Sequence, residues 1–270
     1  MKTLGVIAGG GTVPAYLLTA CERAGITPFV VAFEGQTDPR ILKDRAHLFT
    51  RLGAAGCIIN TLKKNDITDL VLIGSIRRPS LAELKPDMRT AAFFAKIGLK
   101  AHGDDGLLKA LRGALEADGF TLHAVQDFAG DLLAKEGPVG TRKPGKGDGV
   151  DIARGLAVAT GLGGLDVGQA VVVQEGIVLG VEAVEGTDEL LRRCANLKRK
   201  GRGGVLVKIA KPGQDHALDL PTVGPETVRL AAKAGLAGIA VQAGATLLLD
   251  PAEIANVAGK HDMFVVGVRV

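Results

Sequence analysis

The sequence predicts an α/β protein, with an N-terminal Rossmann-like parallel-sheet domain followed by a second α/β domain that has a mixed sheet. In the first half, strand-like and helix-like segments alternate, which is typical of parallel strands joined by crossover helices. In the second half, two β-branched runs flank Gly176 and predict an antiparallel hairpin. Hydrophobic residues make up 47% of the chain, aromatic residues only 3%, and 38 residues are glycine. Such an aliphatic, glycine-rich composition favours buried parallel layers.

The elements of residues 1–133 follow in order. A strand at Leu4–Ala8 ends in three glycines, and a helix begins at Pro14, because proline at the first helical position loses no hydrogen bond. Further along, "PFVVAFEG", "DLVLIGS" and "TLHAV" predict strands. Helical spacing marks "ILKDRAHLFTRL", "GCIINTLKKNDIT", "TAAFFAKIGL" and "DDGLLKALRGALEADG".

Residues 134–150 are predicted to be a linker, because "GPVGTRKPGKGDGV" has many glycines and no periodicity. An active-site loop inside one domain is the alternative. In the domain at 151–270, helices are expected at "DIARGLAVATGLGG", at "GTDELLRRCANLKRK" with Thr187 or Asp188 as N-cap, at "PETVRLAAKAG" and at "PAEIANVAGKHD". Besides the hairpin, "GGVLVKIAK" and "MFVVGVRV" predict strands, and "GIAVQAGATLLLD" a strand pair.

Charge and composition limit the function classes. The formal net charge of +4 suits an anionic ligand or surface, whereas nucleic acid is disfavoured because no aromatic residues are interleaved with the basic ones. The three cysteines lack metal-ligand spacing and are expected to be reduced thiols of a cytoplasmic protein. The longest weakly polar run, residues 234–249, is too short to span a bilayer.

The opening "LGVIAGGGTVP" resembles a dinucleotide-binding turn, but Pro14 replaces the third glycine of the fingerprint. A dinucleotide site is therefore disfavoured. Gly10 and Gly11 either hold one nucleotide phosphate or sugar through backbone N–H groups, or serve only a tight turn.

Two further stretches flank predicted helices or strands. Arg77 and Arg78 follow a buried strand and could clamp a pyrophosphate, or could be solvated. Asp104 and Asp105 precede a helix, where carboxylates favour capping as much as function.

Carboxylates gather in the second half. Glu182, Glu185 and Asp188 lie within seven residues and favour a divalent cation such as Mg²⁺, because like charges this close need a counter-ion or solvent. The loop "KIAKPGQDHALDLPTVG" carries Lys208, Lys211, Gln214, Asp215, His216, Asp219 and Thr222. No nucleophile elbow or P-loop lysine is present, so metal-assisted hydrolysis of a phosphoanhydride fits best.

The basic run Arg192–Gly204 is expected to be a solvated helix end, with approach to anionic lipid headgroups as the alternative.

Several motifs occur in a specific order: "LGVIAGGGTVP", "GSIRRP", "GDDGLL", "DVGQAVVV", "VEAVEGTDELLRR", "GGVLVK" and "QDHALDLPTVGPETV". With them the chain resembles, nearly end to end, the LpxI-type UDP-2,3-diacylglucosamine pyrophosphatases of Gram-negative bacteria. The resemblance implies two α/β domains with a ligand between them, dependence on Mg²⁺ or another divalent metal, and a homodimer. It also implies hydrolysis of UDP-2,3-diacylglucosamine to UMP and 2,3-diacylglucosamine 1-phosphate (lipid X), a step of lipid A synthesis. The enzyme would then work in the cytoplasm, peripherally at the inner face of the inner membrane.

The family's essential aspartate corresponds to Asp219 of "DLPTVG", the first candidate for a catalytic role, followed by Asp188. The full set of candidates is as follows: metal ligands Glu185, Asp188, Asp215 and Asp219; substrate-binding residues Gly10, Gly11, Arg77, Arg78, Asp104, Asp105, Gln169, Thr187, Lys208, Gln214 and Thr222. Ala217 and Gln242 depart from the family pattern, in which arginine and glutamate are expected.

The sequence is also compatible with two other classes of protein. One is an oxidoreductase that uses a nicotinamide or sugar nucleotide. The other is a carrier that binds the lipid or nucleotide without catalysis.

Overall fold

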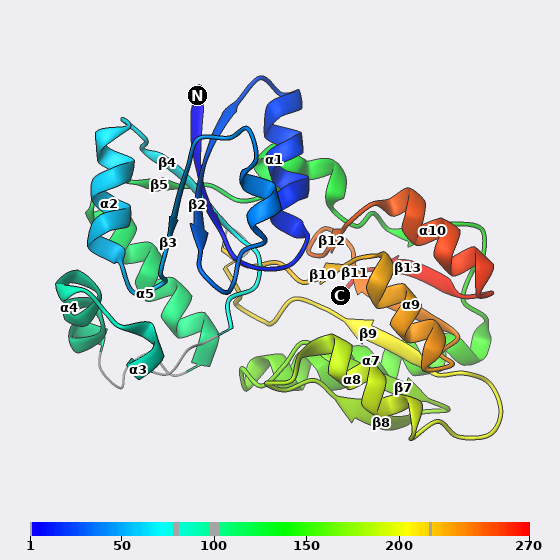
Figure 1. Cartoon of the computed structure of the whole chain (residues 1–270). Coiled ribbons are helices and arrows are strands. Elements are labelled where there is room, and N and C mark those ends of the chain that lie inside the picture. Colours follow the sequence, from blue (N-terminus) through cyan, green and yellow to red (C-terminus); the bar gives the residue numbers. More distant parts are fainter. Residues whose placement is uncertain (1, 78–80, 98–102, 216–217) are drawn as a thin grey trace. The chain divides into compact units, whose positions relative to one another are not determined.

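The computed structural model describes residues 2–77, 81–97, 103–215 and 218–270 (Figure 1). The chain forms two compact units. The first contains Met1–Gly130 and Asp215–Asp219, and the second contains Asp131–Gln214 and Leu220–Val270. The stretch 134–150, predicted to be a linker, holds β6 and the start of α7 and belongs to the second unit.

The first unit is a parallel sheet with helices on both faces. Its strands are β1 (Thr3–Ala8), β2 (Thr27–Phe33), β3 (His47–Thr50), β4 (Asp69–Ile73) and β5 (Thr121–Leu122). Its helices are α1 (Val13–Arg23), α2 (Ala55–Lys64), α3 (Leu81–Leu84), α4 (Met88–Ile97), α5 (Gly103–Ala117) and α6 (Gln126–Ala129). The strand order is β3-β2-β1-β4-β5, which is the order of a doubly wound nucleotide-binding fold.

The buried faces follow from the alternation of side chains along each strand. Phe29, Val31 and Phe33 of β2 pack with Ile58 of α2 and Leu115 of α5 in one cluster. In Figure 1, α1 lies on the other face of this sheet. The predicted parallel α/β domain is confirmed.

The helix predicted over "ILKDRAHLFTRL" is wrong. Residues Pro39–Leu42 form a single 3₁₀ turn, and His47–Thr50 form the edge strand β3, parallel to β2. Leu48 and Leu52, spaced as on a helix, both pack on the core from this strand and the turn after it. Periodicity over so short a run does not separate helix from strand.

The second unit contains a mixed sheet of six strands in the order β6-β13-β11-β9-β7-β8. These strands are β6 (Gly137–Pro138), β7 (Ala170–Gln174), β8 (Ile177–Val181), β9 (Val205–Lys208), β11 (Gly238–Gln242) and β13 (Phe264–Val268). Two short strands, β10 (Thr222–Val223) and β12 (Leu247–Leu248), form a second sheet. The helices are α7 (Lys146–Gly164), α8 (Gly186–Ala195), α9 (Pro225–Lys233) and α10 (Pro251–Lys260).

Strand β9 shows how the two faces of this sheet are filled. Val205 and Val207 belong to the cluster under α7, whereas Leu206 belongs to the cluster under α8, α9 and α10. Gly155 of α7 lies directly over Val207, where a Cβ atom would come within 2.4 Å of the valine side chain. The mixed sheet and the β7–β8 hairpin are therefore confirmed.

Two local expectations in this half are wrong. β12 pairs in parallel with β10 rather than with β11, because the turn after β11 carries the chain to a separate two-stranded sheet. The N-cap of α8 is Glu185, not Thr187 or Asp188, which lie inside the first turn. Among the described residues, no helix has both the length and the apolar character needed to cross a membrane.

Candidate functional site

In the first unit, the candidate residues lie at the carboxyl ends of β1, β2 and β4. The strand order reverses at β1, and ligands of such sheets bind at this point. Gly10 forms a backbone bridge with Ser75, and the two backbone polar groups of Arg77 bond to the side chain of Gln36 at 3.0 and 3.2 Å. The structure therefore brings Gly10, Gly11 and Arg77 to one edge of the first sheet.

The glycines of this turn are needed for close backbone packing. A Cβ atom at Gly9 would come within 2.5 Å of the Ser75 carbonyl oxygen, and one at Gly10 within 2.9 Å of that of Gln36. The N–H groups of Gly9 and Gly10 donate to the carbonyl oxygens of Ile73 and Ser75. Gly11 is exposed with φ of +82°, a left-handed conformation that favours glycine. Backbone donors for a ligand are thus expected from Gly11 onward, at the first turn of α1.

Pro14 lies at the start of α1 and packs against Gly74. A Cβ atom at Gly74 would lie 3.0 Å from Pro14 Cγ and 2.7 Å from the Gly10 carbonyl oxygen. Gly74 therefore permits the close approach between helix and strand that the third glycine of the dinucleotide fingerprint permits elsewhere.

Sequence reasoning missed two residues of this edge, Gln36 and Thr37. The buried Thr37 hydroxyl donates to the Ala8 carbonyl oxygen and accepts the N–H of Phe33 at 2.9 Å. These bonds fix the loop after β2 against the end of β1. Threonine and glutamine in a loop carry no pattern that would have marked them in advance.

Among the described residues, the other candidates of this unit make no contact that assigns them a role. Arg77 is exposed. Arg78, His216 and Ala217 lie outside the described residues. Asp104 and Asp105 occupy the first turn of α5, where the dipole of a helix favours carboxylates in any case.

The Asp215–Asp219 segment belongs to the first unit, although it comes from the second half of the sequence. Asp215 forms an ion pair with Arg112 of α5. Leu218 is buried in the same cluster as Phe29 and Leu115. Asp219 is exposed next to this anchor, and its N–H donates to the Asp215 carbonyl oxygen at 3.1 Å.

The second unit carries a buried cation at the carboxyl end of β9. Lys208 is only 8% exposed, and its Nζ donates to the Thr222 carbonyl oxygen at 3.0 Å. In the described part of the chain, no carboxylate pairs with this ammonium group. A buried charge without a counter-ion is costly, and an ammonium group has three donors, so this position suits an anionic ligand.

Glu182 joins Thr187 to Gln169, the residue just before the strand partner of Lys208. Glu182, itself 6% exposed, accepts the Thr187 hydroxyl at 2.6 Å and the Gln169 N–H at 3.1 Å. Gln169 precedes Ala170, which pairs with Lys208 across the sheet. Its buried Oε1 has no partner among the described residues. Glu182 was not among the leading candidates from sequence, and it is the residue that holds this group together.

The remaining residues of this unit have local partners. Gln214 Oε1 accepts the N–H of Lys211 at 2.9 Å, and the Thr222 hydroxyl donates to the Leu220 carbonyl oxygen at 3.2 Å. Gln242, which stands where a glutamate was expected, accepts the N–H of Ala210 at 3.0 Å and so holds the chain just after β9.

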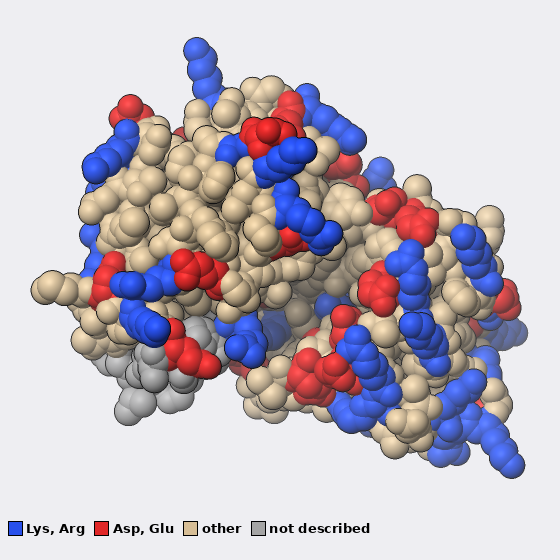
Figure 2. Space-filling view, viewed as in Figure 1, with Lys and Arg blue, Asp and Glu red and all other residues tan. Residues whose placement is uncertain are grey.

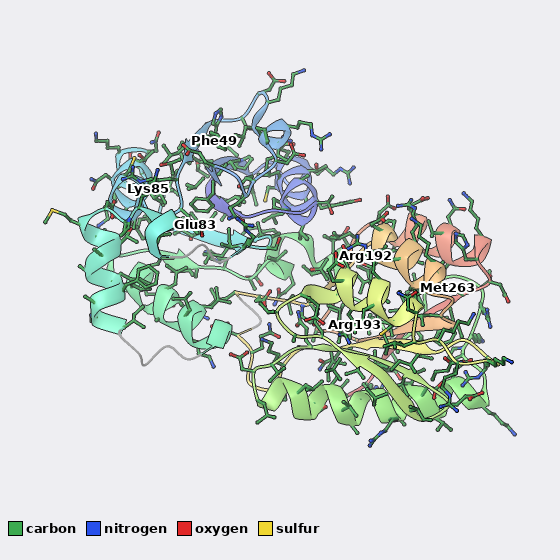
Figure 3. All side chains as sticks on the ribbon, turned by 60° about the horizontal axis from the view of Figure 1, so that its bottom comes forward. Phe49, Glu83, Lys85, Arg192, Arg193 and Met263 are labelled. Atoms are coloured by element: carbon green, nitrogen blue, oxygen red, sulfur yellow. The ribbon has the colours of Figure 1, made fainter. Side chains whose placement is uncertain are left out.

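The predicted metal ligands on α8 are exposed. Glu185 lies 2.7 Å from Arg193, a residue labelled in Figure 3, and Asp188 lies on the first turn of α8. Hydrogen bonds from the backbone of Glu185 itself, and then from Arg193 and Ala183, hold the pKa of Glu185 below its ordinary value. Within the described residues, no three carboxylate, histidine or cysteine side chains are grouped to hold a metal ion.

Two family models and one full-length relative match this chain. The model of the LpxI N-terminal domain matches residues 3–132, and that of the LpxI C-terminal domain matches residues 135–266. The UDP-2,3-diacylglucosamine pyrophosphatase LpxI of Caulobacter vibrioides is 37% identical over 276 residues, covering 99% of this chain and 98% of that protein.

Solved structures give only weak similarity. The biotin carboxylase domain of the Hydrogenobacter thermophilus 2-oxoglutarate carboxylase is 14% identical, with a TM-score of 0.22 over 73% of this chain and 40% of that one. Glycinamide-RNase-transformylase T of Mycobacterium tuberculosis is 12% identical, with a TM-score of 0.25 over 67% and 43%. Scores this low carry no inference. The two domain models and the full-length relative show that the chain belongs to the LpxI family.

Proposed function

We propose that this chain hydrolyses UDP-2,3-diacylglucosamine to UMP and 2,3-diacylglucosamine 1-phosphate in lipid A synthesis. The relative of Caulobacter vibrioides that matches 99% of the chain is named for this substrate. The observation in the structure that supports it best is Lys208, a buried ammonium group with no carboxylate partner in the described part of the chain. A diphosphate would supply the negatively charged partner for this ammonium group.

In the reaction, the oxygen of a water molecule forms a bond to one phosphorus atom, and the bond from that phosphorus to the bridging oxygen breaks. The two products are monophosphates, and the protons of the water leave to the products and solvent. Lys208 is assigned to neutralise charge on the phosphates, and Asp219 to orient or deprotonate the water. Attack at the phosphorus nearer the sugar would place the oxygen of ¹⁸O-labelled water in 2,3-diacylglucosamine 1-phosphate, not in UMP.

Metal dependence is part of the proposal. The candidate ligands are hard oxygen donors of the kind that Mg²⁺ prefers. Mg²⁺ is often held by one or two carboxylates together with water and substrate phosphates, so it needs no group of three protein ligands. Asp215 and Asp219, with Glu185 and Asp188 as the second pair, are the residues that would hold it. Bound Mg²⁺ would stabilise negative charge on the diphosphate.

The glycine turn after β1 is assigned to the uridine nucleotide. The N–H groups of Gly9 and Gly10 already donate to backbone oxygens, so Gly11 and the first turn of α1 are the expected donors. We also propose that the enzyme is cytoplasmic, acts as a homodimer, and associates peripherally with the inner face of the inner membrane, where its diacylated substrate resides.

The experiment incubates the purified chain with UDP-2,3-diacylglucosamine, with Mg²⁺ or with a chelator, and measures the release of UMP. We expect release with Mg²⁺ only. A protein that binds the substrate without releasing UMP would be a carrier, and one that oxidises NAD(P)H would be an oxidoreductase. Either result overturns the proposal.

Two variants test the assigned residues. Asp219→Asn and Lys208→Met should each lower kcat/KM by about 100-fold or more, which is typical for the loss of one charged group that acts in a transition state. Asp66→Asn is the matched control, because Asp66 is exposed in a turn with φ of +54°, a conformation that asparagine tolerates. Full turnover by a folded Asp219→Asn protein would remove the catalytic assignment.

A further inference from the structure

The loop between α8 and β9 is strongly basic and carries an exposed aliphatic residue. After α8 ends at Ala195, the sequence "NLKRKGRGG" leads to β9. Leu197 is 46% exposed, and Lys198, Arg199 and Lys200 are all exposed. In Figure 2, Lys and Arg atoms gather at the lower right corner, where Figure 1 places this loop. We name residues 197–201 the basic loop.

Buried side chains of β7 and α7 hold the backbone of the basic loop and of the residues that follow it. Gln174, fully buried at the end of β7, donates to the carbonyl oxygens of Arg199 and Arg202 and accepts the N–H of Arg199 at 2.9 Å. Arg202 forms ion pairs with the buried Asp148 and Asp151 of α7. A buried amide that makes three bonds to one loop fixes its backbone, so the exposed side chains are presented on a defined support.

The acids of this region are already engaged. Asp148 and Asp151 are buried against Arg202, and Glu175 lies 3.8 Å from Arg199. The ion pairs of this region join Arg199 and Arg202 to acids, and among the described residues none involves Lys198 or Lys200. Two aliphatic side chains lie next to these groups: Ile177, which pairs with Gln174 and is 45% exposed, and Val150, next to Asp151 and 60% exposed.

We propose that the basic loop, with Ile177 and Val150, is the surface by which this chain binds an anionic lipid bilayer. Cationic side chains near such a surface are attracted by its negative potential, while aliphatic side chains among them enter the boundary between headgroups and acyl chains. Nucleic acid is disfavoured because the loop offers no aromatic side chain for stacking. The inference rests on the proposed function, which places the substrate in a membrane.

The surface is separate from the substrate site. β9 runs from Val205, just after the basic loop, to Lys208, so the loop and the lysine lie at opposite ends of one strand. Bilayer binding and phosphate binding are therefore expected to be separable by mutation. The loop would raise the concentration of enzyme at the bilayer without taking part in the reaction.

The experiment measures co-sedimentation of the full chain with vesicles of phosphatidylcholine, either alone or mixed with phosphatidylglycerol. The wild-type chain should bind only the mixed vesicles, and added salt should weaken binding. Lys198→Ser/Lys200→Ser should weaken it about tenfold or more, since each cation near an anionic surface contributes on the order of 1 kcal/mol. Leu197→Ser should weaken the part of the binding that persists in high salt.

Lys43→Ser/Lys64→Ser is the matched control. It removes the same charge from exposed positions of the first unit and should bind like wild type.

Turnover separates this inference from the proposed function. Both basic-loop variants should hydrolyse detergent-solubilised substrate at the wild-type rate and vesicle-borne substrate more slowly. Undiminished vesicle binding by Lys198→Ser/Lys200→Ser, or equal binding of the wild type to uncharged vesicles, overturns the inference. The inference is also overturned if the chain binds RNA but not vesicles, and if these substitutions abolish the RNA binding. If the chain binds anionic vesicles through this loop but releases no UMP, the proposed function fails and the surface stands.

Discussion

Gly10 and Ser75 exchange two backbone hydrogen bonds, of 2.7 and 3.1 Å, which join the loop after β1 to the loop after β4. The bridge sits where the strand order of the first sheet reverses. It leaves no room for side chains between the two loops. The glycine turn therefore has a structural role that does not depend on any ligand, and a nucleotide would bind to a turn that is already formed.

Gly9→Ala tests this packing. The new Cβ atom would lie 2.5 Å from the Ser75 carbonyl oxygen, which is backbone and cannot rotate away. We expect a loss of about 1–3 kcal/mol in the free energy of unfolding, measured by urea denaturation. The control is Gly113→Ala in the exposed part of α5, where no atom lies within 4 Å of the new Cβ, and alanine should be neutral or stabilising. Equal stability of both variants would contradict the packing argument.

Leu218→Ala tests the anchor beside Asp219. Leu218 is 7% exposed in the core of the first unit, so truncation leaves a cavity and should cost about 2–5 kcal/mol of stability. Because Asp219 follows directly, UMP release should fall as well, even where the variant is fully folded. Leu165→Ala, at a position 76% exposed, should change neither quantity. A folded Leu218→Ala protein with wild-type turnover would show that the anchor does not position Asp219.

Asp69 and His123 give a prediction on pH. His123 lies 2.7 Å from Asp69, and this hydrogen bond, with a smaller one from Thr68, holds the pKa of Asp69 below its ordinary value. The folded pKa is lowered, so the stabilisation is present above about pH 4, the usual value for aspartate, and is lost as pH falls through the lowered pKa. The pair is about 30% exposed, so the effect stays below about 1 kcal/mol. Asp69→Asn should flatten the dependence of unfolding free energy on acidic pH, and a slope unchanged from wild type would contradict this.

The fold class followed from sequence because each half of the chain has long, strongly patterned elements. The apolar run Val205–Val207, preceded by two glycines, is one example, since a strand buried on both faces of a sheet carries a continuous run of this kind. The edge strand at His47–Thr50 was missed because it has only four residues, and its Leu48 lies at helical spacing from Leu52, just beyond the strand. Short edge elements gain their identity from the neighbouring strand, which a local pattern does not contain.

The candidate site was less predictable for the same reason. Lys208 and Gln169 were singled out by residue type and position, and the structure places Gln169 next to Ala170, the strand partner of Lys208. Glu182, which joins Gln169 to Thr187, could not be ranked above Glu185 from sequence. Nothing in "QDHALDLPTVG" reveals that Leu218 packs in the core of the first unit, because that contact joins residues far apart in the chain.

The three cysteines should differ sharply in reactivity. Burial, and secondarily the nearby Glu22, raises the pKa of Cys21 to about 11, and burial also raises the pKa of Cys194. Cys57 is exposed on α2. Because the thiolate is the reactive form, a disulfide reagent at neutral pH should label one thiol rapidly in the native protein and all three in denaturant. Cys57→Ser should abolish the rapid phase. Rapid labelling that persists in this variant would show that α1 or α8 opens readily, against the tight packing of Cys21 and Cys194.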